Sequence, residues 1–152
     1  MNKIKKGLSS LQINNKLKKY KTFKGVIPLN HLNQSIWEKE QNIFLILNTD
    51  YCNESGTHWI VLEKNQNKFF IFDSLVSVFN YDKEIKNVLS RNFKRNKILI
   101  QNIFTASCGY FCILYIRLRL SGFTFSEIES FFDRNTLFNE NLLKKLRKIL
   151  KF

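Results

Sequence analysis

Four polar residues of the types needed for thiol chemistry occur between residues 58 and 108. Cys108 stands at the start of an almost unbroken apolar run, "CGYFCILYI", and His58, Asp73 and Gln101 precede it in the chain. A cysteine attacks as a thiolate, and it needs a base, a group that orients this base and donors for an oxyanion. Histidine, aspartate and glutamine can fill these three roles. The residue types therefore predict acyl transfer on Cys108, provided that the fold brings the four side chains together.

The apolar run predicts a helix that begins at Ser107 or Cys108 and is buried on nearly all sides. The first turn of a helix stabilises a negative charge and offers free N–H groups, which suits both a thiolate and an oxyanion. Gly109 has no side chain, so we expect a substrate backbone to approach closely there. Cys112 lies one turn further on the same face and is interpreted as a core residue. Cys52, in a polar loop, is expected to carry no chemistry.

A hairpin is expected to place His58 beside Asp73. The segments "THWIVLEK" and "KFFIFDSL" are typical of strands, and the polar "NQN" between them predicts the turn. A loop at residues 65 and 66, or at 64–67, would set His58 directly opposite Asp73 on one face, whereas a three-residue loop would separate them. A carboxylate at this position fixes the tautomer of the imidazole and stabilises its cation. Taken singly, His58 also fits a packing residue and Asp73 a turn residue.

The other periodicities predict an α+β fold with a mixed central sheet, the buried helix that carries Cys108, and flanking helices. Residues 1–24 read as a short amphipathic helix or a loose basic arm, ended by a break at Gly25 and Pro28. Ser126 with Glu129 has the spacing of a capping box. No linker divides the chain, so we expect one domain over residues 1–152. The remaining expected elements are strands at 42–48 and 97–102, a surface helix at 81–93 and a basic amphipathic helix at 139–152.

Composition limits the classes of protein and compartment. The chain has 25 Lys and Arg against 12 Asp and Glu, a net charge of +13. This charge favours contact with a polyanion such as nucleic acid, but a surface bias from a Lys-rich composition explains it equally well. No apolar run approaches the ~18 residues of a membrane span, and no secretory signal is present. Three cysteines without framework spacing indicate a reducing interior, and neither histidine has the spacing of a zinc ligand.

The order His58-Trp59, Asp73, Gln101, Cys108-Gly109 resembles that of the adenain-like cysteine proteases, the adenovirus maturation protease family, which is related to the SUMO-specific proteases. "GTHWIVL", "FFIFDSL" and "IQNIFTASCGYFC" resemble its three motifs, and "FKGVIP" and "LNTD" extend the resemblance over about residues 20–118. The interval from Gln101 to Cys108 is that of adenain, whereas an aspartate as the acid is closer to the SUMO-protease branch.

By this resemblance Cys108 is the nucleophile and His58 its base, and Asp73 orients His58. Gln101 and the Cys108 backbone N–H form the oxyanion hole, and Trp59 packs beside the site and shields it. The resemblance also implies the adenain-like fold, a mixed sheet with the nucleophile helix buried against it.

The resemblance implies a cysteine endopeptidase that cleaves viral or virus-like capsid and core precursor proteins after glycine. We expect a monomer in the virion or the host-cell interior, nuclear or cytoplasmic, without membrane contact or a metal. A peptide activator and DNA are the family's cofactors. The chain has no cysteine between Asp73 and Gln101, which argues against a disulfide-linked peptide, while its charge keeps DNA open. Two alternatives remain: a SUMO- or ubiquitin-like processing protease, and a catalytically silent, basic nucleic-acid-binding scaffold.

Overall fold

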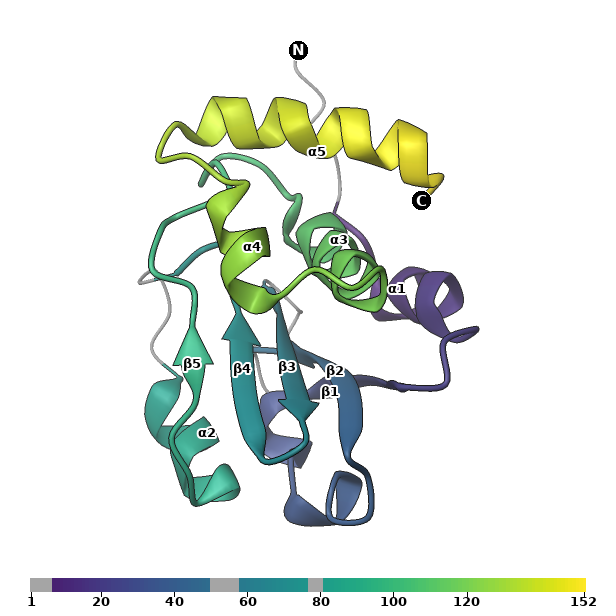
Figure 1. Cartoon of the computed structure of the whole chain (residues 1–152), viewed down its shortest axis with the longest axis vertical. Helices are drawn as coiled ribbons and strands as arrows, with labels where there is room; N and C mark the ends of the chain where they lie inside the picture. Colours follow the sequence, from purple (N-terminus) through teal and green to yellow (C-terminus); the bar gives the residue numbers. More distant parts are fainter. Residues whose placement is uncertain (1–6, 50–57, 77–80) are drawn as a thin grey trace.

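The computed structural model describes residues 7–49, 58–76 and 81–152. In these ranges the chain forms a five-stranded mixed sheet in the order β1-β2-β3-β4-β5, which confirms the α+β class (Figure 1). The outer pairs β1–β2 and β4–β5 are parallel, and the pairs β2–β3 and β3–β4 are antiparallel. The strands are β1 Phe23–Pro28, β2 Asn42–Asn48, β3 Trp59–Asn65, β4 Lys68–Phe72 and β5 Lys94–Arg95.

Helices cover both faces of the sheet. One core joins it to α3, α1, α4 and α5, and a second core joins the opposite face to α2 and the two 3-10 helices. Side chains alternate between these cores along β3, where Val61 points to the α3 side and Ile60 and Leu62 to the other. The helices are α1 Ser10–Leu17, η1 Leu29–His31, η2 Gln34–Ile36, α2 Asp82–Leu89, α3 Cys108–Leu120, α4 Phe125–Ser130 and α5 Thr136–Leu150.

The helix α3 begins at Cys108 with Ser107 as its N-cap residue, as the sequence predicts. Its apolar side chains are buried around the whole circumference because β3 lies on one side and three helices cover the others. Its few polar groups are paired. The Tyr115 hydroxyl donates to the buried carboxylate of Glu63 on β3, and Arg119 donates to the same carboxylate at 2.9 Å. This pairing fixes the rotation of α3 against the sheet.

The predicted register of the β3–β4 hairpin is wrong by two residues. Asn65 pairs with Lys68 and Val61 with Phe72, so the turn consists of Gln66 and Asn67. Gln66 has a φ of 54°, and its N–H donates to the Gln41 carbonyl at 2.7 Å. This contact comes from the start of β2, outside the hairpin, and it selects the turn position. A shift of two residues keeps each side chain on its predicted face.

The strand predicted at 97–102 is absent: among the described residues, only Lys94 and Arg95 pair with β4 on the side away from β3. The N–H groups of Ile100 and Gln101 instead both donate to the Ser74 carbonyl, at 3.0 and 2.9 Å. These backbone N–H groups therefore form their hydrogen bonds within a turn after β4, and not with a neighbouring strand.

Gly25 and Pro28, which were predicted to end the N-terminal segment with a break, lie in the strand β1. Pro28 ends this strand at the edge of the sheet, where a missing N–H costs little. Gly25, with a φ of 126°, lies where the register with β2 shifts between Phe23 and Val26. A glycine at a bulge adopts such a positive φ without strain.

Two predicted helix starts are also corrected. Thr124 and Glu127 form the capping box of α4, with Glu127 N–H to Thr124 Oγ1 at 3.1 Å. The predicted cap, Ser126 with Glu129, lies inside the helix, where Glu129 accepts the Lys97 N–H at 2.8 Å. The C-terminal helix begins at Thr136, three positions before its expected start, and this places Asn139 within its first turns. The basic N-terminal segment contains the helical alternative, α1, capped by Ser9.

Candidate active site

His58 and Asp73 meet at one end of the sheet. His58 directly precedes β3 and Asp73 directly follows β4, so antiparallel pairing brings them to the end where the β4 arrow finishes in Figure 1. The His58 Nε2 lies 2.6 Å from Asp73 Oδ1, and both side chains are fully buried. Because of the corrected register they are diagonal neighbours, and not the directly opposed pair that was predicted. The hydrogen bond between His58 and Asp73 is as expected, although their relative position in the strand register is not.

Asp73 is held by further donors to its carboxylate. Oδ1 also accepts the Leu75 N–H at 2.8 Å, and Oδ2 accepts the Tyr81 hydroxyl and Arg95 Nη2, the latter at 3.3 Å. Burial raises the pKa of Asp73, but the hydrogen bond and charge of His58, with the bonds from Tyr81 and Leu75, outweigh it and lower this pKa below its usual value. Asp73 is therefore a fixed carboxylate.

The backbone of Asp73 is fixed by one buried side chain. Asn96 accepts the Asp73 N–H at 2.8 Å and donates Nδ2 to the Asp73 carbonyl at 2.7 Å. This amide replaces a partner strand at the point where β4 ends. Asn96, Tyr81 and Arg95 were not among the predicted site residues, because they lie 8 to 23 positions from Asp73 and share no motif with it.

His58 is held as a cation. Burial alone would lower its pKa, but the hydrogen bonds with Asp73 and Cys108 and the charges of both raise the pKa of His58 from 6.5 to about 9. The His58 Nε2 is hydrogen-bonded to Asp73, so Nδ1 is the ring nitrogen that can exchange a proton with the Cys108 thiol. This arrangement suits an imidazolium beside a thiolate.

An NMR titration should therefore give a pKa of about 9 for His58. The folded-state pKa lies above the ordinary value, so the ring stays protonated at neutral pH and loses its proton only in the alkaline range. The measurement is the ¹⁵N shift of the ring nitrogens across the pH range. A midpoint below 6.5 would mean that burial outweighs the partners, and it would contradict the imidazolium.

Gln101 is oriented unambiguously. Its Oε1 accepts the Ser74 hydroxyl and its Nε2 donates to the Thr105 carbonyl, both at 2.8 Å. A carbonyl can only accept, so the amide nitrogen must face Thr105. Nε2 carries a second hydrogen, which can donate to an oxyanion. Ser74, the residue next to Asp73, thus holds the Gln101 amide, and it was not among the predicted site residues.

Cys108 is nearly buried and is the first residue of α3. It lies within hydrogen-bonding reach of His58, one of the causes of the raised pKa of that ring. The N-terminal N–H groups of α3 point to the same end of the sheet, where they can stabilise negative charge on sulfur or on an oxyanion. Cys108 thus lies close enough to His58 to affect its pKa, and His58 is hydrogen-bonded to Asp73.

Gly109 and Trp59 both face the N-terminal segment. A Cβ on Gly109 would lie 3.2 Å from Leu8 Cβ and Ile13 Cδ1, so this glycine allows α1 to pack closely on α3. The side of Gly109 on which a Cβ would stand is therefore occupied by α1 and Leu8, and the approach of a substrate backbone to Gly109 stays a prediction. Trp59 is buried, and its Nε1 donates to the Leu8 carbonyl at 3.0 Å.

Cys112 is a core residue, as predicted. It is 1% exposed, and its Sγ donates to the Trp59 carbonyl at 3.3 Å. Burial, followed by the charges of Cys108 and Asp73, raises the pKa of Cys112 well above its usual value, so it stays a thiol. Cys52, the third cysteine, lies outside the described residues.

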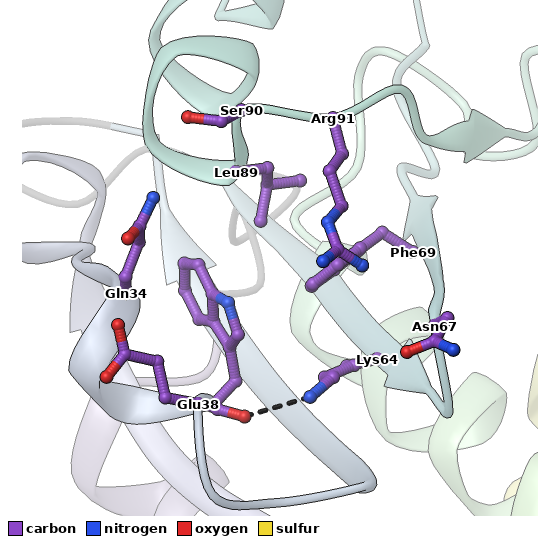
Figure 2. Close-up of a pocket in the computed structure, with 9 residues that line it drawn as sticks. Gln34, Glu38, Lys64, Asn67, Phe69, Leu89, Ser90 and Arg91 are labelled. Carbon is purple, nitrogen blue, oxygen red and sulfur yellow. Dashed lines mark hydrogen bonds between the residues drawn. The ribbon is translucent and has the colours of Figure 1, made fainter.

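A separate cavity of about 550 Å³ lies on the face of the sheet that is opposite to α3 (Figure 2). The rings of Trp37 and Phe69, with centroids 5.8 Å apart, line it, and Lys64 donates to the Trp37 carbonyl at 2.9 Å. None of the predicted site residues lines it. Its members are Gln34, Trp37, Glu38, Lys64, Asn67, Phe69, Leu89, Ser90 and Arg91.

The described parts of the chain contain no cluster of three His, Cys, Asp or Glu side chains that could hold a metal ion. In the same ranges, no helix has the length and apolar character to cross a membrane.

The fold of this chain is similar to that of a protease of known structure. The solved structure concerned is the ASFV pS273R protease in its selenomethionine form, with a TM-score of 0.51 and 18% sequence identity. The match covers 82% of this chain but only 62% of that one, so this chain spans less than two thirds of its length. No protein-family model matches the sequence, and no curated protein does either. The similarity therefore concerns the fold, and the resemblance to adenain-like proteases stays a prediction.

Proposed function

We propose that this chain is a cysteine endopeptidase whose nucleophile is Cys108. One observation carries the proposal: a fully buried His58–Asp73 hydrogen bond of 2.6 Å lies beside a thiol at the start of a buried helix. Burying two ionisable groups is costly, and such pairs concentrate at functional sites. The similarity of the fold to that of a protease supports the same class of activity.

The reaction proposed is acyl transfer in two steps. The Cys108 thiolate attacks the scissile carbonyl carbon, and the oxyanion accepts hydrogen bonds from Gln101 Nε2 and the Cys108 N–H. The His58 imidazolium then gives its proton to the leaving amine, and a thioester remains on Cys108. Neutral His58 next takes a proton from water, the resulting hydroxide attacks the thioester, and the acid product leaves as the thiolate returns.

The substrate class rests on the resemblance of the motifs. We propose cleavage after glycine in capsid and core precursor proteins of a virus or virus-like element, in the virion or the host-cell interior. Ubiquitin-like precursors, the alternative substrates, also end in glycine, so the residue before the cleaved bond does not distinguish them.

The test uses the purified chain and fluorogenic peptide amides that differ only in the residue before the cleaved bond. We expect hydrolysis of the glycine peptide, weaker hydrolysis of the alanine peptide and none after treatment with iodoacetamide. Cleavage of ubiquitin-like fusions in preference to these peptides would favour a processing protease. No hydrolysis of any substrate, combined with firm DNA binding, would favour the silent scaffold.

The basic charge suggests DNA as a partner of the same protein. Two segments far apart in sequence meet through Arg117, which donates to the Leu150 carbonyl and lies over the rings of Tyr20 and Phe152. This contact joins the lysines that follow α1 to those on α5, and we define the combined set as the terminal basic surface. Its exposed lysines are Lys18, Lys19, Lys21, Lys144, Lys145, Lys148 and Lys151.

Duplex DNA should bind the terminal basic surface with an affinity that falls steeply as salt rises. Replacing Lys144, Lys145 and Lys148 with glutamine should reduce the log–log salt slope by about three, since each lost phosphate contact removes about 0.9. Fluorescence anisotropy of labelled DNA at several salt concentrations measures this slope. The matched control replaces Lys39, Lys83 and Lys86, which are exposed elsewhere. Equal slopes in both triple variants would show that the charge is only a surface bias.

A further inference from the structure

The helix α5 is basic and largely exposed, yet it carries two consecutive buried polar residues. Asn139 is fully buried and Glu140 is 8% exposed. An amphipathic helix that only docks on a core presents apolar side chains to it. Polar side chains at that interface need partners, and their partners show what the helix holds in place.

Glu140 binds the segment that separates Gln101 from Cys108. Its Oε1 accepts the Asn102 N–H at 3.1 Å, the Thr105 hydroxyl at 2.7 Å and the Ser107 hydroxyl at 2.9 Å. Ser107 is the N-cap residue of α3, but its side chain makes no cap hydrogen bond and donates to Glu140 instead. One carboxylate therefore holds both ends of this segment, residues 102–107.

Asn139 anchors the residue before Gln101. Its Nδ2 donates to the Ile100 carbonyl at 3.0 Å and to the Asp133 carbonyl at 2.6 Å, while Oδ1 accepts the Asp133 N–H at 2.8 Å. The bonds to Asp133 fix the start of α5, and the bond to Ile100 joins that start to the candidate site. Figure 1 shows α5 lying across the end of the molecule at which β4 finishes.

A chain of hydrogen bonds leads from Glu140 to the oxyanion donor. Glu140 accepts the Thr105 hydroxyl, and the Thr105 carbonyl accepts Gln101 Nε2 at 2.8 Å. Thr105 therefore helps to determine where the Gln101 amide points, and Thr105 is held by Glu140 together with the Asn102 carbonyl, which accepts the Thr105 N–H at 3.0 Å. Within the described residues no cation pairs with Glu140, so its charge is stabilised by the donors of this same segment.

We infer that Glu140, supported by Asn139, is a positioning residue that fixes the segment 102–107 and thereby aims Gln101 at the oxyanion. The inference deepens the proposed function and rests on it for its catalytic consequence. The contacts of Glu140 do not depend on the proposed function. Its effect on the position of the segment 102–107 and its effect on catalysis can therefore be tested separately.

The first experiment measures position through amide hydrogen exchange. In Glu140→Ala the Asn102 N–H loses its acceptor, and we expect exchange there to quicken about tenfold or more, as for a lost charge-assisted bond. Glu140→Gln keeps an acceptor oxygen and should restore part of the protection. The control is Asn141→Ala, an exposed neighbour. Unchanged protection of β2 and β3 amides would show that the fold is intact.

The second experiment separates the oxyanion from the thiol. Alkylation of Cys108 by iodoacetamide forms no oxyanion, whereas hydrolysis of the glycine peptide does. In Glu140→Ala we expect kcat to fall about 10- to 100-fold, less than the full loss of an oxyanion donor, with KM little changed. Alkylation should be unchanged or faster, because a negative charge near the thiolate is removed.

Each result decides the inference. Equal Asn102 exchange in Glu140→Ala and the wild type would overturn it, and so would a parallel loss of alkylation and turnover. Faster exchange with a selective loss of kcat would support it. If the wild type hydrolyses no peptide but Glu140→Ala still loosens the segment, the proposed function fails and the positioning role stands.

Discussion

Replacing Cys108 with alanine is expected to abolish peptide hydrolysis while the protein stays folded. The proposed reaction forms its covalent intermediate on the Cys108 sulfur, and Cys112, the other described cysteine, stays a thiol. Removal of a nucleophile that acts together with a base costs orders of magnitude, so we expect a loss of about 10³-fold or more. Alanine is small and a good helix former, and it fits the first turn of α3. Initial rates on the glycine peptide and thermal unfolding monitored by circular dichroism measure the two effects.

Cys112→Ala is the matched control for this prediction. Cys112 lies one turn further along α3, is also buried and makes a hydrogen bond to the Trp59 carbonyl. Its replacement removes packing and this bond, so we expect a destabilisation of about 1–2 kcal/mol with nearly full activity. Full hydrolysis by Cys108→Ala, or equal losses in both variants, would remove the basis for a nucleophile at position 108.

The second large effect is expected from Asp73→Asn, which keeps the shape of the side chain and removes its charge. Without the charge of Asp73, burial is opposed only by Cys108, and the pKa of His58 should fall well below its wild-type value of about 9. A smaller fraction of the ring is then protonated at physiological pH, and less imidazolium is available to protonate the leaving amine. By analogy with triads in which the acid was replaced, we expect kcat to fall by about 10⁴. The ¹⁵N titration and the pH profile of kcat report the two consequences.

Asp82→Asn controls for the disturbance of the neighbouring network. Arg95 donates to Asp82 Oδ1 at 2.6 Å as well as to Asp73, so each variant removes the charge of one of its acceptors. Asp82→Asn should leave the pKa of His58 and kcat close to the wild type. A His58 that still titrates near 9 in Asp73→Asn would sink the assignment of Asp73 as the group that holds the imidazolium.

Asp73→Asn should also destabilise the fold. The donors on Tyr81 and Arg95 lose a charged acceptor in a buried position, which typically costs about 3–5 kcal/mol. Kinetics must therefore be measured at a temperature at which chemical denaturation shows the variant to be folded.

Local patterns in the sequence determined the fold class, the strand at residues 42–48 and the first residue of α3. These features depend on neighbours within a few positions. A continuous apolar run marks a strand covered on both faces, and a run that is apolar all round marks a buried helix. The closeness of His58 and Asp73 could be predicted for a similar reason, because any turn of even length places them on the same side of the hairpin.

Only the tertiary structure decided the details that define the site. The hairpin turn is set by a contact from Gln41, and the end of β4 is held by the side chain of Asn96. Glu140 reaches residues 33 to 38 positions earlier in the chain. A buried polar group takes whichever partner the fold brings within about 3 Å, and no periodicity encodes that choice. The sequence determined which chemical groups the protein has, and tertiary contacts decided which of them hold the others in place.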